Sequence, residues 1–118
     1  NYPLRVISGT GFWFLMEKNT PHYELAVIKA EVRRLGQKAF TKASVKSAEK
    51  LGFNLSEMLE IVFELQTRML YKSMTTYDDH RVWQDVYHIN SKGLEIYIKV
   101  TYRPAGGAPV ISFKEKNP

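Results

Sequence analysis

The spacing of apolar residues changes at Leu70, and this change divides the chain into two kinds of structure. Before Leu70, apolar residues recur at steps of three and four, which is typical of amphipathic helices. After it, apolar and polar residues alternate, most regularly over residues 94–101, where aliphatic residues take every second position. Such alternation is typical of strands with one buried face. Helices followed by consecutive antiparallel strands predict an α+β fold, with N-terminal helices packed on one face of a C-terminal sheet.

Helices are expected wherever a capping residue precedes an apolar stripe. The first is expected to begin at Thr20, a good N-cap residue that a proline follows, and to end at Gly36. Thr41 predicts the cap of a second helix. Asn54, with Glu57 three residues later, resembles a capping box and predicts the start of a third helix.

The alternating region is typical of an antiparallel sheet whose strands are joined by polar or glycine- and proline-rich turns. We expect strands at residues 70–77, 82–89, 94–101 and 110–116. Pairing about the turn at residues 78–81 places Lys72 near Val86 or His88, with Gln84 as a diagonal neighbour.

The exposed side of this sheet is expected to gather side chains that can bind phosphate and move a proton. The candidate catalytic residues are Lys72, Gln84, Tyr97 and Lys114. The expected RNA-binding residues beside them are Lys99, His88 and Arg81. RNA carries its own nucleophile, the 2′-hydroxyl, so lysines that stabilise phosphate charge and a tyrosine or histidine that transfers a proton suffice. The pattern alone favours the simpler interpretation that lysine and tyrosine merely populate exposed strand positions, with a metal-independent ribonuclease as the alternative.

The turn between the first two strands holds a histidine and acidic residues. His80 is expected to hydrogen-bond Asp78 or Asp79 as a turn residue, with proton transfer as the alternative. The acids Asp78, Asp79 and Asp85 lack the spacing of metal ligands. We therefore expect no metal site and no cofactor.

The chain has no cysteine and a formal net charge of +5. The lack of cysteine excludes disulfides, thiol nucleophiles and cysteine-based metal sites, and it is compatible with a reducing cytosol. The positive charge permits binding to nucleic acid, an acidic partner or a membrane surface. Because the apolar run near the N-terminus is too short to span a membrane, we expect a cytoplasmic protein without membrane association.

Three segments of the chain resemble the MqsR family of toxin–antitoxin mRNA interferases, which lies within the broader RelE-like fold. They are MEK-x-TPH at Met16–His22, YKSMTTY-x-DH-x-x-WQDVY at Tyr71–Tyr87, and SFKEK at Ser112–Lys116. The YKSMTTY run is highly specific, and the resemblance extends over residues 16–116. Its departures are residues 1–15 and a turn at residues 104–109 that looks longer than the family's.

The resemblance implies an endoribonuclease that cleaves mRNA with a preference for GCU-type sites and without needing the ribosome. The family's proposed active-site residues fall on Lys72, Gln84, Tyr97 and Lys114, the same residues that strand alternation indicates. The implied partners are an mRNA substrate and an MqsA-like antitoxin that binds zinc on its own chain.

The family pattern begins at Met16, which looks like a natural start. We interpret residues 1–15 as an N-terminal extension without a family counterpart, and residues 16–118 as a single MqsR-like domain. The alternative is that residues 1–15 add an edge strand to the sheet.

Two other functions fit the same residues. A non-catalytic RNA-binding module would use the basic face to retain RNA without cutting it. A protein-interaction domain would use its sheet edge to accept a strand of the partner. Only the family resemblance favours the nuclease over both.

Overall fold

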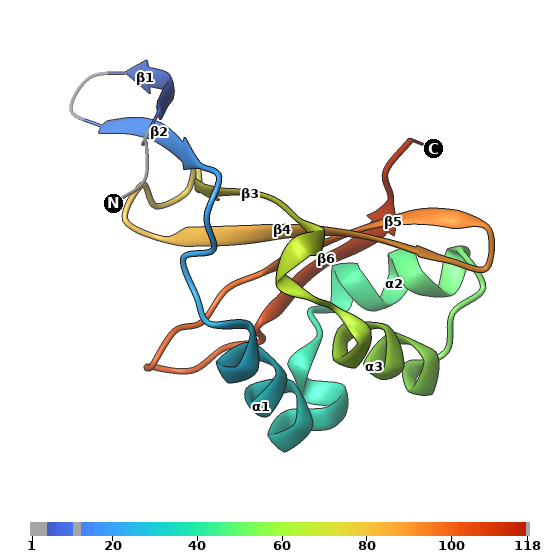
Figure 1. Ribbon diagram of the computed structural model, residues 1–118. Coiled ribbons are helices and arrows are strands. Elements are labelled where there is room, and N and C mark those ends of the chain that lie inside the picture. The colour runs from blue at the N-terminus through green and yellow to red at the C-terminus, as the bar shows by residue number, and fades with distance from the viewer. Residues whose placement is uncertain (1–4, 11–12, 118) are drawn as a thin grey trace.

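The computed structural model describes residues 5–10 and 13–117 (Figure 1). The helices are α1 (Leu25–Leu35), α2 (Lys42–Lys50) and α3 (Leu55–Glu64), with the 3-10 turns η1 (Gly36–Ala39) and η2 (Thr67–Met69). The strands are β1 (Arg5–Thr10), β2 (Trp13–Lys18), β3 (Leu70–Thr75), β4 (Trp83–Ser91), β5 (Leu94–Val100) and β6 (Val110–Glu115). These strands form one antiparallel sheet in the order β1-β2-β3-β4-β5-β6.

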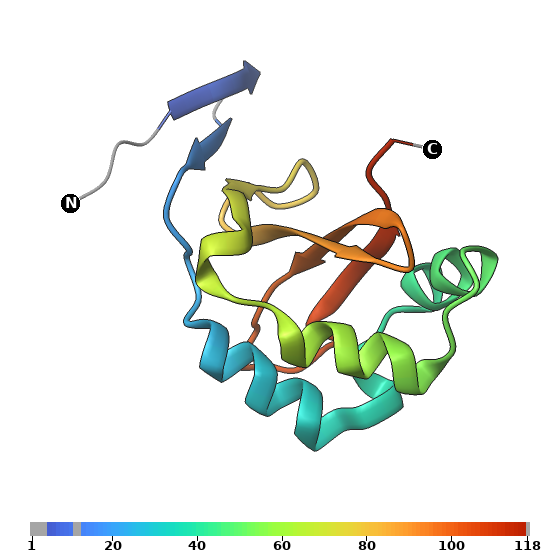
Figure 2. The same cartoon turned by 45° about the vertical axis from the view of Figure 1, so that its right-hand side comes forward.

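The three helices lie together on one face of the sheet, as Figure 2 shows. The core between the two layers is built from aliphatic and aromatic side chains, among them Ile28, Val32, Met58, Val62, Tyr87, Ile96, Ile98 and Phe113. The predicted α+β arrangement, with helices on one face of a C-terminal sheet, is confirmed. Strands β1 and β2 extend this sheet beyond β3.

Two of the three predicted helix starts are confirmed. The Thr41 side chain accepts a hydrogen bond from the backbone of Ser44 and caps α2. Asn54 and Glu57 form both bonds of the predicted capping box at α3. Each cap satisfies backbone N–H groups that the first helical turn leaves without partners.

The prediction that the first helix begins at Thr20 is wrong, because α1 begins at Leu25. The preceding segment is held in a non-helical path by Asp85 of β4. Its carboxylate accepts hydrogen bonds from the backbone N–H of His22, at 3.0 and 3.1 Å, and from that of Tyr23, at 2.9 Å. These N–H groups bind a residue far away in the sequence, so a local capping signal could not predict where the helix starts.

Asp85 belongs to a buried polar cluster beside the helices. Asp85 is fully buried, and Lys18 is 2% exposed. The Lys18 ammonium lies 2.9 Å from Nδ1 of His22, whose ring stacks on Trp83 at 4.9 Å between centroids. Burial lowers the pKa of His22, the nearby Lys18 lowers it further, and Asp85 acts in the opposite direction. Nδ1 of a neutral His22 ring can therefore accept a hydrogen bond from the Lys18 ammonium.

Replacement of Asp85 by asparagine is expected to destabilise the protein strongly. One carboxylate oxygen that accepts backbone N–H groups becomes a donor, and N–H groups are left unsatisfied inside the protein. We expect the free energy of unfolding to fall by about 2–4 kcal/mol, measured by urea denaturation. Glu31→Gln, which removes only an exposed ion pair with Arg34, is the control and should change the midpoint little. Equal midpoints for Asp85→Asn and the unmodified protein would contradict the account.

The interpretation of residues 1–15 as an extension remains a prediction. The structure indicates how many N-terminal residues a deletion can remove. Leu15 is only 3% exposed, and β2 pairs with β3 through Glu17 and Lys18. Deletion should therefore stop before Leu15. We expect a chain without residues 1–14 to unfold cooperatively, near the melting temperature of the longer chain, and to keep its activity. Loss of folding or of activity would favour the edge-strand alternative.

Candidate active site on the outer face of the sheet

The predicted catalytic side chains lie on the face of the sheet turned away from the helices, which we call the outer face. Tyr87, Ile98 and Phe113 are buried in the core, so their strand neighbours point to the opposite side. His88 pairs with Tyr97, and Tyr97 pairs with Lys114. One row of side chains therefore crosses β4, β5 and β6.

A second row runs beside the first and carries two lysines. Lys72 pairs with Val86, and Val86 pairs with Lys99. Val86 is fully buried although it belongs to the outer face. Of the two predicted neighbours of Lys72, Val86 and His88, the register selects Val86. The lysines therefore flank an apolar position, where they can bury their stems and keep their ammonium groups toward solvent.

Aromatic rings connect the two rows. The Tyr71 ring stacks on His88, with centroids 4.6 Å apart, and His88 is tilted against Tyr97 at 5.7 Å. The Lys72 ammonium lies 5.2 Å from the centroid of Tyr71, within the range of cation–π attraction. The ammonium groups of Lys99 and Lys114 lie 5.5 and 5.7 Å from the centroid of the Tyr97 ring. We call this group the outer-face cluster: Tyr71, Lys72, His88, Tyr97, Lys99 and Lys114.

The pKa shifts in the outer-face cluster favour neutral rings among cations. Burial raises the pKa of Tyr97, although Lys114 and Lys72 lower it, so the phenol keeps its proton near pH 7. Burial and the nearby Lys116 lower the pKa of His88, with Glu95 acting in the opposite direction. A phenol that can donate a proton therefore lies beside an imidazole that can accept one.

Lys99 and Lys72 repel each other within the cluster. Burial lowers the pKa of Lys99, and the charge on Lys72 lowers it further. Lys72 is balanced by Glu17 of β2, whose carboxylate lies 3.0 Å from its ammonium. A phosphate placed between the lysines would relieve this repulsion, so the face is suited to an anionic ligand.

Sequence reasoning missed Tyr71 and Glu17. Simple alternation assigns Tyr71 and Lys72 to opposite faces, but the register shifts between Leu70 and Lys72, and Tyr71 stacks on the outer-face residue His88. Tyr71 is 53% exposed, so much of its surface stays open to solvent. The position of Tyr71 in the YKSMTTY run was the available signal. Glu17 depends on the pairing of β2 with β3, for which the sequence offers no local signal.

Two predicted residues lie outside the outer-face cluster. Gln84 is on the same face, opposite Met74 and diagonal to Lys72. Arg81 lies in the turn between β3 and β4, where its guanidinium is 3.1 Å from Asp79 and lowers the pKa of that carboxyl. The structure therefore brings Lys72, Tyr97 and Lys114 together and leaves Arg81 in the turn.

Two of the acids considered as metal ligands are occupied by hydrogen bonds and ion pairs. Asp79 binds Arg81, and Asp85 accepts the backbone N–H groups described above. Within residues 5–10 and 13–117, no three His, Asp or Glu side chains are grouped as metal ligands would be. No helix in this part of the chain combines the length and apolar character that crossing a membrane requires.

Comparison with known proteins identifies the family of the chain. The family model described as "Motility quorum-sensing regulator, toxin of MqsA" matches residues 20–115. The mRNA interferase toxin MqsR of Escherichia coli (strain K12) is 39% identical over 101 residues, which cover 86% of this chain and 100% of that protein. The resemblance that the YKSMTTY run indicated is confirmed, and the chain belongs to the MqsR toxin family.

Proposed function

We propose that this protein is an endoribonuclease toxin that cleaves mRNA at GCU-type sites without a metal ion. The outer-face cluster is the observation that carries the proposal. It combines ammonium groups, a protonated tyrosine and a neutral histidine on one face of a sheet. The E. coli relative is named an mRNA interferase, which supports the same activity for this chain.

The reaction needs only groups that the RNA and the outer face supply. The 2′-hydroxyl attacks the adjacent phosphorus, and the bond from phosphorus to the 5′-oxygen of the next nucleotide breaks. The products are a 2′,3′-cyclic phosphate and a free 5′-hydroxyl. One proton leaves the attacking hydroxyl and one reaches the departing oxygen, so a proton acceptor and a proton donor are required.

We assign these roles to residues by position and charge. Lys72 and Lys114 stabilise the negative charge that develops on the phosphate oxygens. Tyr97, flanked by both, donates its proton or a hydrogen bond toward the phosphate or the leaving oxygen. His88, neutral and in contact with Tyr97, accepts the proton of the 2′-hydroxyl. Gln84 orients the RNA from the edge of the cluster.

The remaining predicted contacts hold the RNA backbone. Lys99 of β5 lies beside the reacting groups, and Arg81 lies in the turn between β3 and β4. Both would act on phosphates and so contribute to affinity without reading the sequence. The formal net charge of +5 supports attraction to a polyanion.

We further propose that an MqsA-like antitoxin, which binds zinc on its own chain, neutralises this toxin. The matching family is described as the toxin of MqsA, which supports a partner of that kind. Because the substrate is mRNA, both proteins would act in the cytoplasm. Addition of such an antitoxin in equal amount should stop cleavage of mRNA by this protein.

Removal of either catalytic lysine should abolish most of the cleavage. We expect Lys72→Ala and Lys114→Ala each to lower the cleavage rate by about 10²-fold or more, because each removes charge stabilisation from the transition state. The assay uses a defined RNA with GCU sites in the presence of EDTA, with products mapped by primer extension. Melting temperatures should change little, because both side chains are partly or fully exposed.

Lys46→Ala is the matched control for these variants. Lys46 is an exposed lysine of α2, on the helical layer rather than on the outer face, and its removal changes the net charge equally. It should cleave RNA like the unmodified protein. A lysine variant that cuts at the unmodified rate would remove that lysine from the site. Intact RNA retained by a folded protein would favour the RNA-binding module.

Replacement of Tyr97 by phenylalanine separates proton transfer from ring contacts. The variant keeps the ring that lies against His88, Lys99 and Lys114 and loses only the hydroxyl. We expect the cleavage rate to fall by about 10²-fold or more, as for loss of a general acid. Affinity for an RNA with a 2′-O-methyl group at the cleaved nucleotide should be retained. If affinity and rate fell together, Tyr97 would be a binding residue only.

A further inference from the structure

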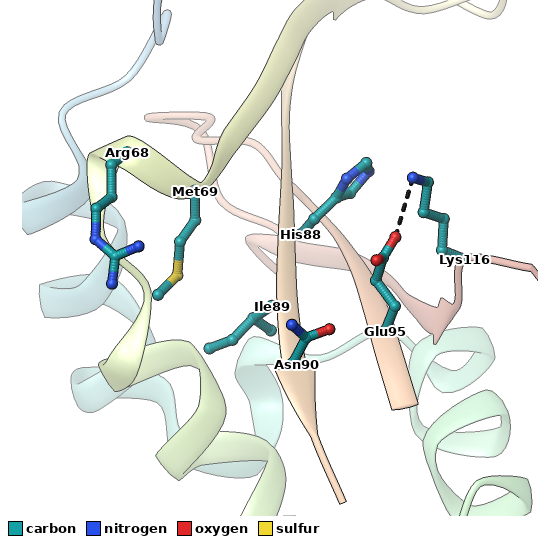
Figure 3. Close-up of a pocket in the computed structure, with 7 residues that line it drawn as sticks. All are labelled: Arg68, Met69, His88, Ile89, Asn90, Glu95 and Lys116. Carbon is teal, nitrogen blue, oxygen red and sulfur yellow. Dashed lines mark ion pairs between the residues drawn. The ribbon is translucent and has the colours of Figure 1, made fainter. Parts of the chain in front are cut away.

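An open cleft of about 530 Å³ adjoins the outer-face cluster. It is lined by Arg68, Met69, His88, Asn90, Glu95 and Lys116, together with Ile89, as Figure 3 shows. His88 belongs to both the cleft and the cluster. The cleft and the outer-face cluster are therefore adjacent, and His88 is the residue at which they meet.

The cleft follows from the way β3 begins. Leu70 is the first residue of β3 and pairs with Tyr87 of β4. Before Leu70 the chain forms η2, and in the described part of the chain β3 pairs with no residue of β4 beyond Tyr87. The final residues of β4, including Asn90, therefore pair with β5 on one edge and are not paired by β3 on the other. That edge offers additional hydrogen-bonding groups to a ligand.

We propose that this cleft binds one nucleobase of the single-stranded RNA, that of a nucleotide next to the cleaved bond, and thereby sets part of the sequence selectivity. The inference rests on the proposed ribonuclease function and names a substrate-binding site for it. Arg68 and Asn90 are the residues that would read the base.

The lining combines apolar surface with groups that match the edge of a base. Met69 and Ile89 supply apolar surface, and the His88 ring can stack on a base. Nε2 of His88 is buried and has no hydrogen-bond partner among the described residues. Protein sites for single-stranded RNA typically pair such stacking surfaces with hydrogen bonds to exposed base edges.

The polar groups of the cleft include both donors and acceptors. Nε of Arg68 donates a hydrogen bond to the Gln66 side chain at 2.8 Å. Among the described residues, its guanidinium has no other side-chain partner. Its terminal nitrogens can therefore donate hydrogen bonds to a base. Asn90 has an amide that both donates and accepts, and it pairs in the sheet with Glu95. Glu95 lies 3.0 Å from the Lys116 ammonium. Every nucleobase presents donors and acceptors at fixed positions, and such a set can distinguish one base from another.

The charge of the cleft favours a nucleic acid over a cationic ligand. Arg68 and Lys116 contribute two positive charges and Glu95 one negative charge. The lysines of the outer-face cluster continue this positive surface beyond His88. A base in the cleft would therefore be joined to a backbone that crosses a basic surface, and its neighbouring phosphate would lie toward Tyr97.

The test measures base preference separately from cleavage. A set of short RNAs that differ only at each position around the cleaved bond is given to the unmodified protein and to the variants Arg68→Ala and Asn90→Ala. We expect the variants to lose about 10- to 100-fold in kcat/KM for the preferred base at one position. For RNAs with the other bases at that position, kcat/KM of the variants should change little, so the preference at that position disappears.

Arg103→Ala is the matched control for loss of charge. Arg103 is exposed in the loop between β5 and β6, away from the cleft, and its removal lowers the net charge equally. This variant should keep the preference at every position. If Arg68→Ala and Asn90→Ala also keep the full preference while cutting normally, the cleft is not the base site, and the ribonuclease function stands.

A binding measurement decides the case in which RNA is not cut. The same sequences carrying a 2′-O-methyl group at the cleaved nucleotide are titrated with each protein by fluorescence anisotropy. Loss of base preference in Arg68→Ala and Asn90→Ala supports the cleft whether or not cleavage occurs. An unmodified protein that binds these RNAs without preference, or does not bind them, overturns the inference; absence of cleavage overturns the proposed function separately.

Discussion

The buried carboxylate of Asp85 is the interaction on which the arrangement of the site depends. It accepts backbone N–H groups from the segment before α1 and thereby ties the helical layer to β4. Side chains alternate along a strand, and a shift of one residue would move every side chain of β4 to the other face. With Asp85 held on the helical side, Gln84 and His88 must point outward. The same bond that stabilises the fold thus orients the site.

The two faces of the sheet differ because one stabilises the fold and the other carries the candidate site. The helical side buries apolar residues such as Tyr87, Ile98 and Phe113, which supply most of the stability. The outer side gathers lysines close together, which costs electrostatic energy that Glu17 only partly offsets. Clusters of like charge whose pKa values are shifted are typical of binding and catalytic sites, because the ligand supplies the missing countercharge.

The sequence predicts best those features that depend on near neighbours. The capping box at Asn54 and the alternation along β5 require only short-range information, and both are found as expected. One wrong prediction and one missed residue come from long-range contacts. The start of α1 depends on Asp85, more than sixty residues away. The outward position of Tyr71 depends on a register shift against β4.

The same distinction applies to the site. Alternation alone could place Tyr97 and Lys114 on one face, because each alternates regularly with buried neighbours, and the hairpin register about residues 78–81 could bring Lys72 to the same face. It could not predict that Glu17 would bind Lys72, or that η2 would leave a cleft beside His88. Those features arise where strands begin or end, and periodicity carries no information about such points.

The central claim is that the outer face cleaves RNA through the 2′-hydroxyl, with charge stabilisation from lysines. The most direct measurement is mass spectrometry of the products formed by the purified protein from a defined RNA in EDTA. The account predicts a 2′,3′-cyclic phosphate on one fragment and a 5′-hydroxyl on the other. Fragments that carry a 3′-hydroxyl and a 5′-phosphate would contradict it, because they arise when water, rather than the 2′-hydroxyl, attacks the phosphorus.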